Sequence, residues 1–167
     1  GMTDREVEIT PAKAFSKISN SMLNDGVAYS AVFFGNPNTG KTSMALLWAE
    51  LWKELAPMKY GTDLEPVVIT NADTLGLADH VAQSIEEFRT LVFGSIEWFE
   101  SNGQHGEPPT IDPDRPIFWL FDECSTHLDA RTNSYEIAEQ YTPLLKRFAK
   151  VSVDAAHIGH SGYDIHA

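Results

Sequence analysis

The residues best suited to do chemistry form one short run, Gly35-Asn36-Pro37-Asn38-Thr39-Gly40-Lys41-Thr42. The run fits the spacing G-x-x-x-x-G-K-[ST], which is typical of a loop that holds the phosphates of a nucleotide. Glycine at Gly35 and Gly40 lets the main chain curl close to phosphate oxygens, where a Cβ atom would collide. Lys41 is then expected to reach the outer phosphates, and the Thr42 hydroxyl to bind Mg²⁺.

The loop departs from the commonest pattern at Asn38, where many such loops carry glycine. The departure is mild, because asparagine is among the few residues that tolerate left-handed backbone angles. We therefore expect the phosphates of a nucleotide to be bound by the whole loop and by the residue that follows it. These nucleotide-binding residues are Gly35, Asn36, Pro37, Asn38, Thr39, Gly40, Lys41, Thr42 and Ser43.

A pair of carboxylates follows an apolar run about 80 residues after the loop. Ile117–Phe121 is apolar throughout, which is typical of a strand covered on both faces, and it ends in Asp122 and Glu123. At the tip of such a strand Asp122 is expected to hold Mg²⁺, usually through water. Glu123 is expected to polarise the water that attacks the γ-phosphate.

The segments around the loop predict a strand before it and a helix after it. Val27–Phe34 is a short apolar run rich in strand-forming residues. After the loop, apolar residues recur at the spacing of an amphipathic helix, and Pro57 and Gly61 then indicate a break. The predicted apolar face consists of Met44, Leu47, Trp48, Leu51, Trp52 and Leu55. A helix that begins under the loop favours anions through its dipole.

The middle of the chain predicts a second strand and a long helix. Pro66–Thr70 reads as a buried strand, with Asn71 and Asp73 at its C-terminal tip. Apolar residues at helical spacing then predict one helix from about Asp79 to Ser101. Ser101–Pro116 holds two glycines and four prolines, which predicts an irregular loop.

The C-terminal part predicts a further helix and a fourth strand. Ile137–Phe148 has a helical pattern that Thr142-Pro143 is expected to restart, and Val151–Ala156 reads as a strand. Strands that alternate with helices predict an α/β fold, namely a three-layer α/β/α sandwich with a mostly parallel sheet. We expect residues 1–26 to form an N-terminal extension and residues 27–167 to form one domain.

Together, the loop and the Asp122–Glu123 strand resemble the additional-strand, catalytic-glutamate branch of P-loop ATPases. This branch includes AAA-type, RecA-like and FtsK/HerA-like motors, and it places an extra strand between the P-loop strand and the acidic strand. Within it, the short domain and the ending from Phe148 to Gly162 are similar to Zot-like and related viral or plasmid ATPases. The resemblance implies an ATPase with Lys41 and Glu123 as catalytic residues and Thr42 and Asp122 as magnesium ligands.

In this branch a polar residue at the tip of the next strand senses the γ-phosphate. The resemblance offers His157 and His160 for this role, and we prefer His160 because it follows Gly159 at the end of the apolar stretch. Both depart from the commoner Asn, Thr or Gln. A zinc site is an alternative use of these histidines; it would consist of His157, His160, Asp164 and His166.

Three basic residues are candidates to stabilise charge on the nucleotide of a neighbouring subunit, which would imply a ring or dimer. They are Arg131, Lys146 and Arg147, and the alternative is that they are solvent-exposed charges on helix faces. Cys124, the only cysteine, reads as a small packed residue. A fifth core strand is not evident from the pattern.

The chain has 24 acidic and 12 basic residues, a formal charge of −12, in 167 residues. Such a field repels polyphosphate backbones, so any contact with nucleic acid must be local. The basic cluster around Lys150 is too small to predict a nucleic-acid surface. With neither an apolar run near 18 residues nor a signal pattern in the sequence, we expect a cytoplasmic protein with no membrane segment.

The leading hypothesis is therefore an ATPase that drives a motor or remodelling event, with DNA as one candidate substrate. A nucleotide or small-molecule kinase is an alternative, although the sequence lacks an arginine-rich lid. A non-hydrolysing nucleotide-binding assembly module is another. A GTPase is disfavoured because no N-K-x-D motif for reading the base occurs.

Overall fold

The computed structural model describes residues 30–35, 40–123 and 151–160, without the side chains of residues 30–35, Lys41 and His160. Predictions for residues 1–29, 36–39, 124–150 and 161–167 lie outside these described residues. They include the N-terminal extension and the helix expected over Ile137–Phe148. Within the described stretches, none of the helices combines the length and the apolar character needed to cross a membrane.

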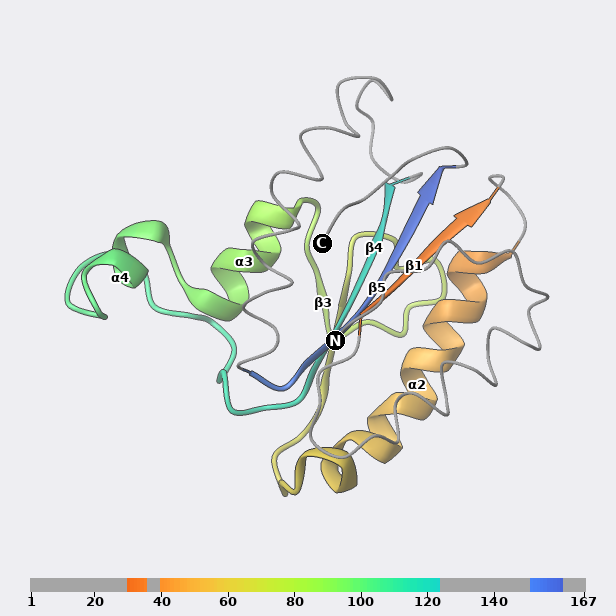
Figure 1. Ribbon diagram of the computed structural model, residues 1–167, viewed down its shortest axis with the longest axis horizontal. Coiled ribbons are helices and arrows are strands. Elements are labelled where there is room, and N and C mark those ends of the chain that lie inside the picture. The colour runs from red at the N-terminus through yellow and green to blue at the C-terminus, as the bar shows by residue number, and fades with distance from the viewer. Residues whose placement is uncertain (1–29, 36–39, 124–150, 161–167) are drawn as a thin grey trace.

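In the described part of the chain, five strands form one sheet in which every neighbouring pair is parallel (Figure 1). In chain order they are β1 (Ser30–Gly35), β2 (Val67–Thr70), β3 (His80–Val81), β4 (Ile117–Asp122) and β5 (Val153–His160). Their order across the sheet is β1-β5-β4-β2-β3, so β5 lies between β1 and β4. Every residue of β2 and β4 is buried, as expected for parallel strands covered on both faces. The expected α/β fold with a parallel sheet is confirmed.

Two strand predictions need correction. The strand expected over Val151–Ala156 begins at Val153 and runs on to His160, so His157 lies inside β5 and does not follow it. The short strand β3 was not predicted, because two residues carry no periodic pattern and Val81 is half exposed. It pairs with the end of β2.

Helix α2 (Lys41–Tyr60) follows the loop as predicted. It is longer than predicted, and the face that it buries differs from the predicted apolar face. It continues through Pro57 and ends at Gly61, whose φ of 61° suits glycine. Leu47, expected on the apolar face, is 59% exposed. The buried stripe consists of Ala45, Leu46, Trp48, Ala49, Trp52 and Ala56. Small alanines let the helix approach the sheet closely, and counting only large apolar residues missed them.

The single helix expected over Asp79–Ser101 is wrong. The segment contains β3, α3 (Ile85–Phe93) and α4 (Ile96–Glu100). The helix breaks at Gly94, which has φ 78° and ψ −174°, and a Cβ atom there would lie 2.7 Å from the Glu107 carbonyl oxygen. Each helix begins at a serine cap, since the Ser84 side chain accepts from the Glu87 N–H and the Ser95 side chain from the Trp98 N–H.

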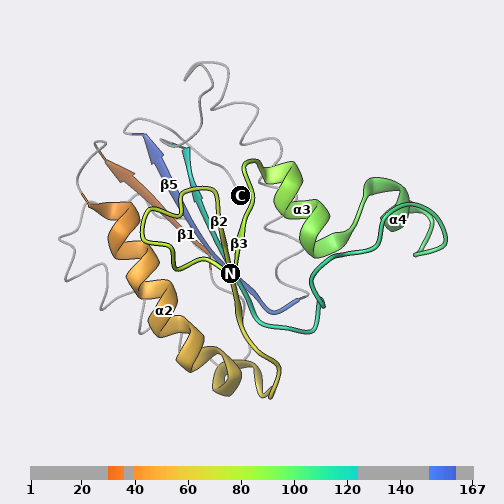
Figure 2. The same cartoon turned by 180° about the vertical axis from the view of Figure 1, so that it is seen from behind.

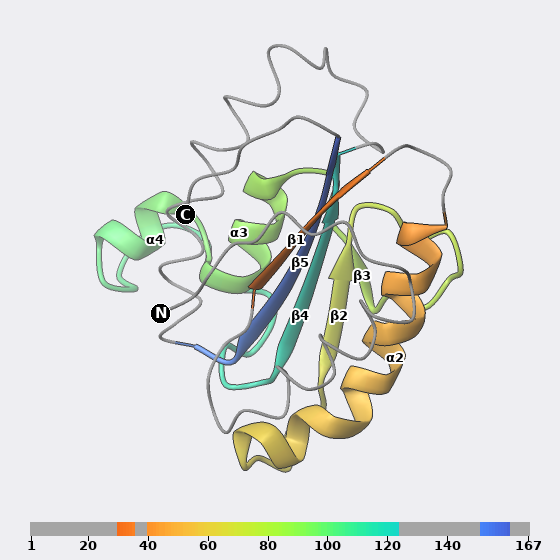
Figure 3. The ribbon, with the colours of Figure 1, turned by 45° about the vertical axis from the view of Figure 1, so that its right-hand side comes forward.

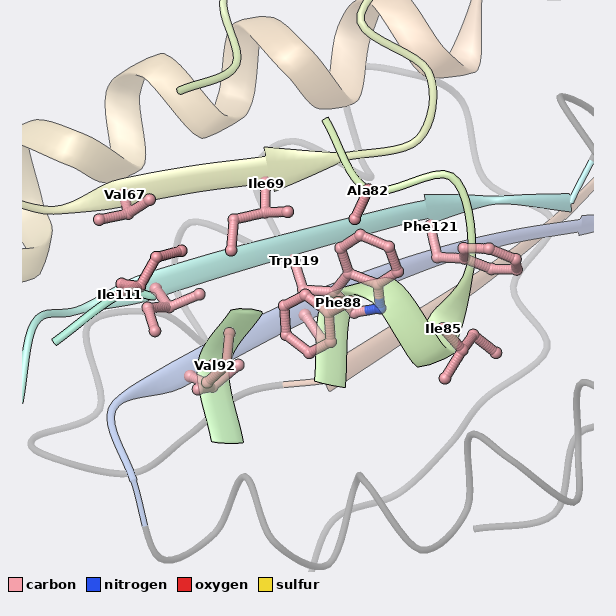
Figure 4. Close-up of a cluster of buried hydrophobic side chains, with 12 residues drawn as sticks. Val67, Ile69, Ala82, Ile85, Phe88, Val92, Ile111, Trp119 and Phe121 are labelled. Carbon is pink, nitrogen blue, oxygen red and sulfur yellow. The ribbon is translucent and has the colours of Figure 1, made fainter. Parts of the chain in front are cut away.

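The described helices cover both faces of the sheet, with α2 on one side and α3 on the other (Figure 2, Figure 3). The α3 side holds a cluster in which the Phe88 and Trp119 rings stack with centroids 4.2 Å apart (Figure 4). On the α2 side, Trp48 meets Phe118 edge-on at 4.8 Å. Because side chains alternate along β4, Phe118 and Leu120 face α2, whereas Trp119 and Phe121 face α3.

Parallel pairing brings the carboxyl ends of the central strands to one edge of the sheet. Gly35 at the end of β1 pairs with His160, and Asp122 at the end of β4 pairs with Ile158. The start of the phosphate-binding sequence and the acidic strand tip therefore lie at the same edge of the sheet, with only β5 between their two strands.

Candidate functional site

The loop sequence lies between the end of β1 and the start of α2. Gly40 adopts the left-handed conformation with φ 78°. A residue with a side chain would be strained in this conformation, which glycine adopts freely. The first turn of α2 carries no acidic residue, so no carboxylate of that turn opposes an anion at this helix end. Residues 36–39 and the Lys41 side chain lie outside the description, and their predicted contacts with phosphates stay predictions.

Thr42 and Asp122 are brought together from positions 80 residues apart in the sequence. The Thr42 hydroxyl donates a hydrogen bond of 2.5 Å to Asp122 Oδ2. Asp122 is the last residue of β4 and is only 3% exposed. Its side chain points to the α2 face, following the alternation of Phe118 and Leu120. The hydroxyl oxygen of Thr42 and the carboxylate of Asp122 are both oxygen ligands of the kind that Mg²⁺ prefers. The residues present therefore suit the expected cation.

Glu123 has a different neighbour. Its Oε1 atom lies 2.9 Å from Nε2 of His157, and both side chains are buried. His157 belongs to the α3 face, where its ring meets Phe121 edge-on with centroids 5.4 Å apart. Asp122 is level with Ile158 in the pairing of β4 and β5, so Glu123, one residue further on, reaches back along β5 to meet His157. The two adjacent carboxylates thus lie toward opposite faces of the sheet.

Asn71 supports this strand tip from β2. Its side-chain amide donates to the Asp122 carbonyl and accepts from the Asp122 N–H, each at 2.8 Å. The sequence placed Asn71 at the tip of β2 and gave it no role. Its position one residue beyond a buried strand was the available signal, because a buried amide there needs partners on the neighbouring strand.

Of the two sensor candidates, His157 is the one with a described contact to Glu123. His160 ends β5 and pairs with Gly35, but its side chain lies outside the description, so its sensor role stays a prediction. The zinc alternative involves Asp164 and His166, which also lie outside. Among the residues that the structure describes, no group of three or more His, Cys, Asp or Glu side chains could hold a metal ion.

The remaining candidates, Cys124, Arg131, Lys146 and Arg147, lie outside the described residues. The structure adds a buried charge cluster that the sequence analysis missed. Asp154, fully buried in β5, accepts from Trp52 Nε1 and from Lys59 Nζ, each at 2.8 Å. Burial, and then the Asp154 carboxylate, raise the pKa of the Tyr60 hydroxyl. An aspartate within an apolar strand sequence was the signal for such a cluster, because a buried carboxylate needs partners.

Comparison with known proteins adds no family to this geometry. No protein-family model matches the sequence, and no curated protein matches it either. The chemistry of the chain has to be argued from its own residues.

Proposed function

We propose that this chain binds ATP together with Mg²⁺ and hydrolyses it, as a P-loop ATPase with a three-layer α/β/α domain. The observation that carries the proposal is the Thr42–Asp122 hydrogen bond. Thr42 belongs to the phosphate-loop sequence and Asp122 to a strand tip 80 residues away. A hydroxyl and a carboxylate from these two places are the protein ligands that such a nucleotide site uses for its metal ion.

The order of the strands also supports the proposal. The additional-strand branch of P-loop ATPases is expected to have a strand between the P-loop strand and the acidic strand. In this chain β5 has that position between β1 and β4. Helix α2, which continues from the loop, packs on one face of the sheet, and α3 packs on the other.

Each residue of the proposed site has its own task in the proposed reaction. Mg²⁺, when bound, would supply positive charge that neutralises the β- and γ-phosphate oxygens. Thr42 and Asp122 would hold the metal, while Lys41 and the N-terminal end of α2 would hold the phosphates. Glu123 accepts a proton from the attacking water and so makes it a better nucleophile. Before it can do so, its carboxylate must turn from His157 toward the carboxyl edge of the sheet, where Asp122 meets Thr42.

The proposal includes assembly and a macromolecular substrate as its less direct parts. The resemblance to motor ATPases favours a homo-oligomer, in which Arg131 or Arg147 would reach a neighbour's nucleotide, and DNA as the first substrate to test. A kinase remains the second candidate function, because a kinase would also need the Thr42–Asp122 pair. In a kinase an acceptor hydroxyl replaces the attacking water.

The direct test is nucleotide binding by the wild type and by the Lys41→Ala variant. Lys41 is the only cationic residue of the loop sequence, so its loss leaves phosphate charge uncompensated. Calorimetry should detect binding of MgATP to the wild type and no binding, or far weaker binding, to the variant. Equal affinities would refute the site. Phosphate release with and without single- and double-stranded DNA, over a range of protein concentrations, then tests hydrolysis, assembly and substrate.

A further inference from the structure

We infer that Asn71 is a positioning residue for the metal ligand Asp122, acting on its main chain and not on its carboxylate. The inference rests on the proposed function and extends it to the residue that aims the magnesium ligand. It starts from a pair of hydrogen bonds between the side chain of Asn71 and the main chain of Asp122, which join β2 to the tip of β4.

The two hydrogen bonds fix the orientation of the amide. A main-chain N–H can only donate and a main-chain carbonyl can only accept, so Oδ1 of Asn71 must face the Asp122 N–H and Nδ2 must face the Asp122 carbonyl. Both distances are 2.8 Å. Of the twenty side chains, only those of asparagine and glutamine offer a planar donor and acceptor pair that could meet both groups at once.

The position of Asp122 in the sheet explains why it needs this support. The pairing of β2 with β4 ends at Thr70 and Leu120, two residues before Asp122. On its other side Asp122 is still paired with Ile158 of β5. The side-chain amide of Asn71 makes the hydrogen bonds to Asp122 that the main chain of β2 would make if the pairing continued. The main chain around Asp122 is therefore bound from both neighbouring strands.

Held in this way, the strand tip delivers its carboxylates in fixed directions. The Asp122 side chain meets Thr42 on the α2 face, and Glu123 continues to His157 on the α3 face. A rotation of the Asp122 main chain would move both carboxylates together. Asn71 is only 8% exposed, so water cannot readily replace its hydrogen bonds if the side chain is removed.

The expected consequence is a loss of metal affinity without a loss of phosphate binding. Removing a group that supports a metal ligand costs typically about 10- to 100-fold in metal affinity. In the Asn71→Ala variant we expect the Mg²⁺ concentration for half-maximal binding of a fluorescent ATP analogue to rise about tenfold or more. Binding of the same analogue in excess EDTA should be unchanged, because Lys41 and the loop do not depend on Asn71.

The matched control is Asp73→Ala, at the same strand tip. Asp73 accepts from the Leu77 and Ala78 N–H groups and makes no described contact with Asp122. Its replacement should lower the melting temperature of the nucleotide-free protein and leave the Mg²⁺ dependence at the wild-type value. A purely structural role for Asn71 predicts that the two variants behave alike.

A second variant guards against simple misfolding. Asn71→Ser keeps a small polar side chain but is one bond too short to reach the two main-chain groups, and should show the same shift in the Mg²⁺ dependence as Asn71→Ala. A wild-type Mg²⁺ dependence in either folded Asn71 variant would overturn the inference, as would equal weakening with and without EDTA. If the wild type itself shows no Mg²⁺-dependent binding of the analogue, the proposed function fails with it. A wild type that binds normally beside an unshifted Asn71→Ala variant refutes the inference alone.

Discussion

Two buried aspartates on neighbouring strands have very different partners. Asp154, near the amino end of β5, is bound by the Lys59 ammonium and the Trp52 indole. Asp122, at the carboxyl end of β4, accepts from the Thr42 hydroxyl. The Asp154 cluster ties α2 to the sheet near the C-terminal end of the helix, whereas the Asp122 contact lies near its N-terminal end. The same helix therefore contacts one buried aspartate of the sheet near each of its ends.

The difference indicates what each carboxylate is for. An ammonium and a buried carboxylate neutralise each other, and such a pair has nothing to gain from a metal ion. A hydroxyl and a carboxylate are both hard oxygen ligands, so together they can take up Mg²⁺ without breaking an ion pair between them. We therefore expect changes at Asp154 to act on folding and changes at the Asp122 tip to act on the nucleotide.

The largest effect on stability is expected from Lys59→Met. Methionine keeps most of the side-chain length but leaves the Asp154 carboxylate without its ammonium partner in the protein interior. Breaking a buried ion pair in this way costs about 3–5 kcal/mol in the free energy of unfolding. Denaturant unfolding of the nucleotide-free protein measures it. A loss below about 1 kcal/mol, the value typical of an exposed ion pair, would contradict the structural role given to the Asp154 cluster.

The next largest effect is expected from Glu123→Gln, and it concerns turnover. The substitution keeps the size and an acceptor oxygen but removes the charge that, in the proposed reaction, accepts a proton from water. At saturating MgATP the rate should fall by a factor on the order of 10² or more, while MgATP binding changes little. Glu100→Gln, the same change at an exposed position of α4, should leave the rate unchanged. Unchanged turnover in Glu123→Gln would favour the kinase hypothesis.

The sequence predicted the parts of this contrast that depend on local pattern. Ile117–Phe121 was predicted as a strand because a short run that is apolar throughout is typical of a strand covered on both faces, and β4 confirms it. The position of the two acidic residues at the tip of this strand, and the position of the loop before a helix, could be predicted from the order of residues along the chain. The structure then brought Thr42 and Asp122 together at the expected edge.

Other features depended on contacts between distant segments, or on local signals that the prediction did not weigh. The predicted helix across Gly94 failed because the main chain there packs against Glu107, thirteen positions further on. The contact between Glu123 and His157 required the order of the strands, which sets β5 beside β4. Serine caps at Ser84 and Ser95 were readable in the sequence, and giving them weight would have divided the helix correctly.

Thr42→Val tests the same contrast at the proposed metal site. Valine has nearly the shape of threonine but lacks the hydroxyl that meets Asp122. The Mg²⁺ concentration for half-maximal binding of MgATP should rise by about tenfold or more, because Thr42 is a proposed ligand and loss of a group that only supports a ligand already costs about 10- to 100-fold. The free energy of unfolding without nucleotide should fall by about 1.5–3 kcal/mol, the usual range for a hydrogen bond to a charged group. Thr90→Val in α3 is the matched control and should leave the Mg²⁺ dependence unchanged.

The smallest effect is expected from Lys53→Met, which repeats the Lys59 substitution on the same helix at an exposed pair. Lys53 lies 2.8 Å from Asp79, and their side chains are 26% and 38% exposed. Asp79 also accepts from the Val68 N–H, so it keeps a partner when the lysine is removed. Water and salt screen such pairs, and the expected loss in the free energy of unfolding is about 0–1 kcal/mol, smaller still at high salt. Denaturant unfolding at low and high salt, beside Lys59→Met, measures the difference. A loss as large as that of Lys59→Met would mean that burial does not distinguish the two lysines, and the structural role given to Asp154 would fall with it.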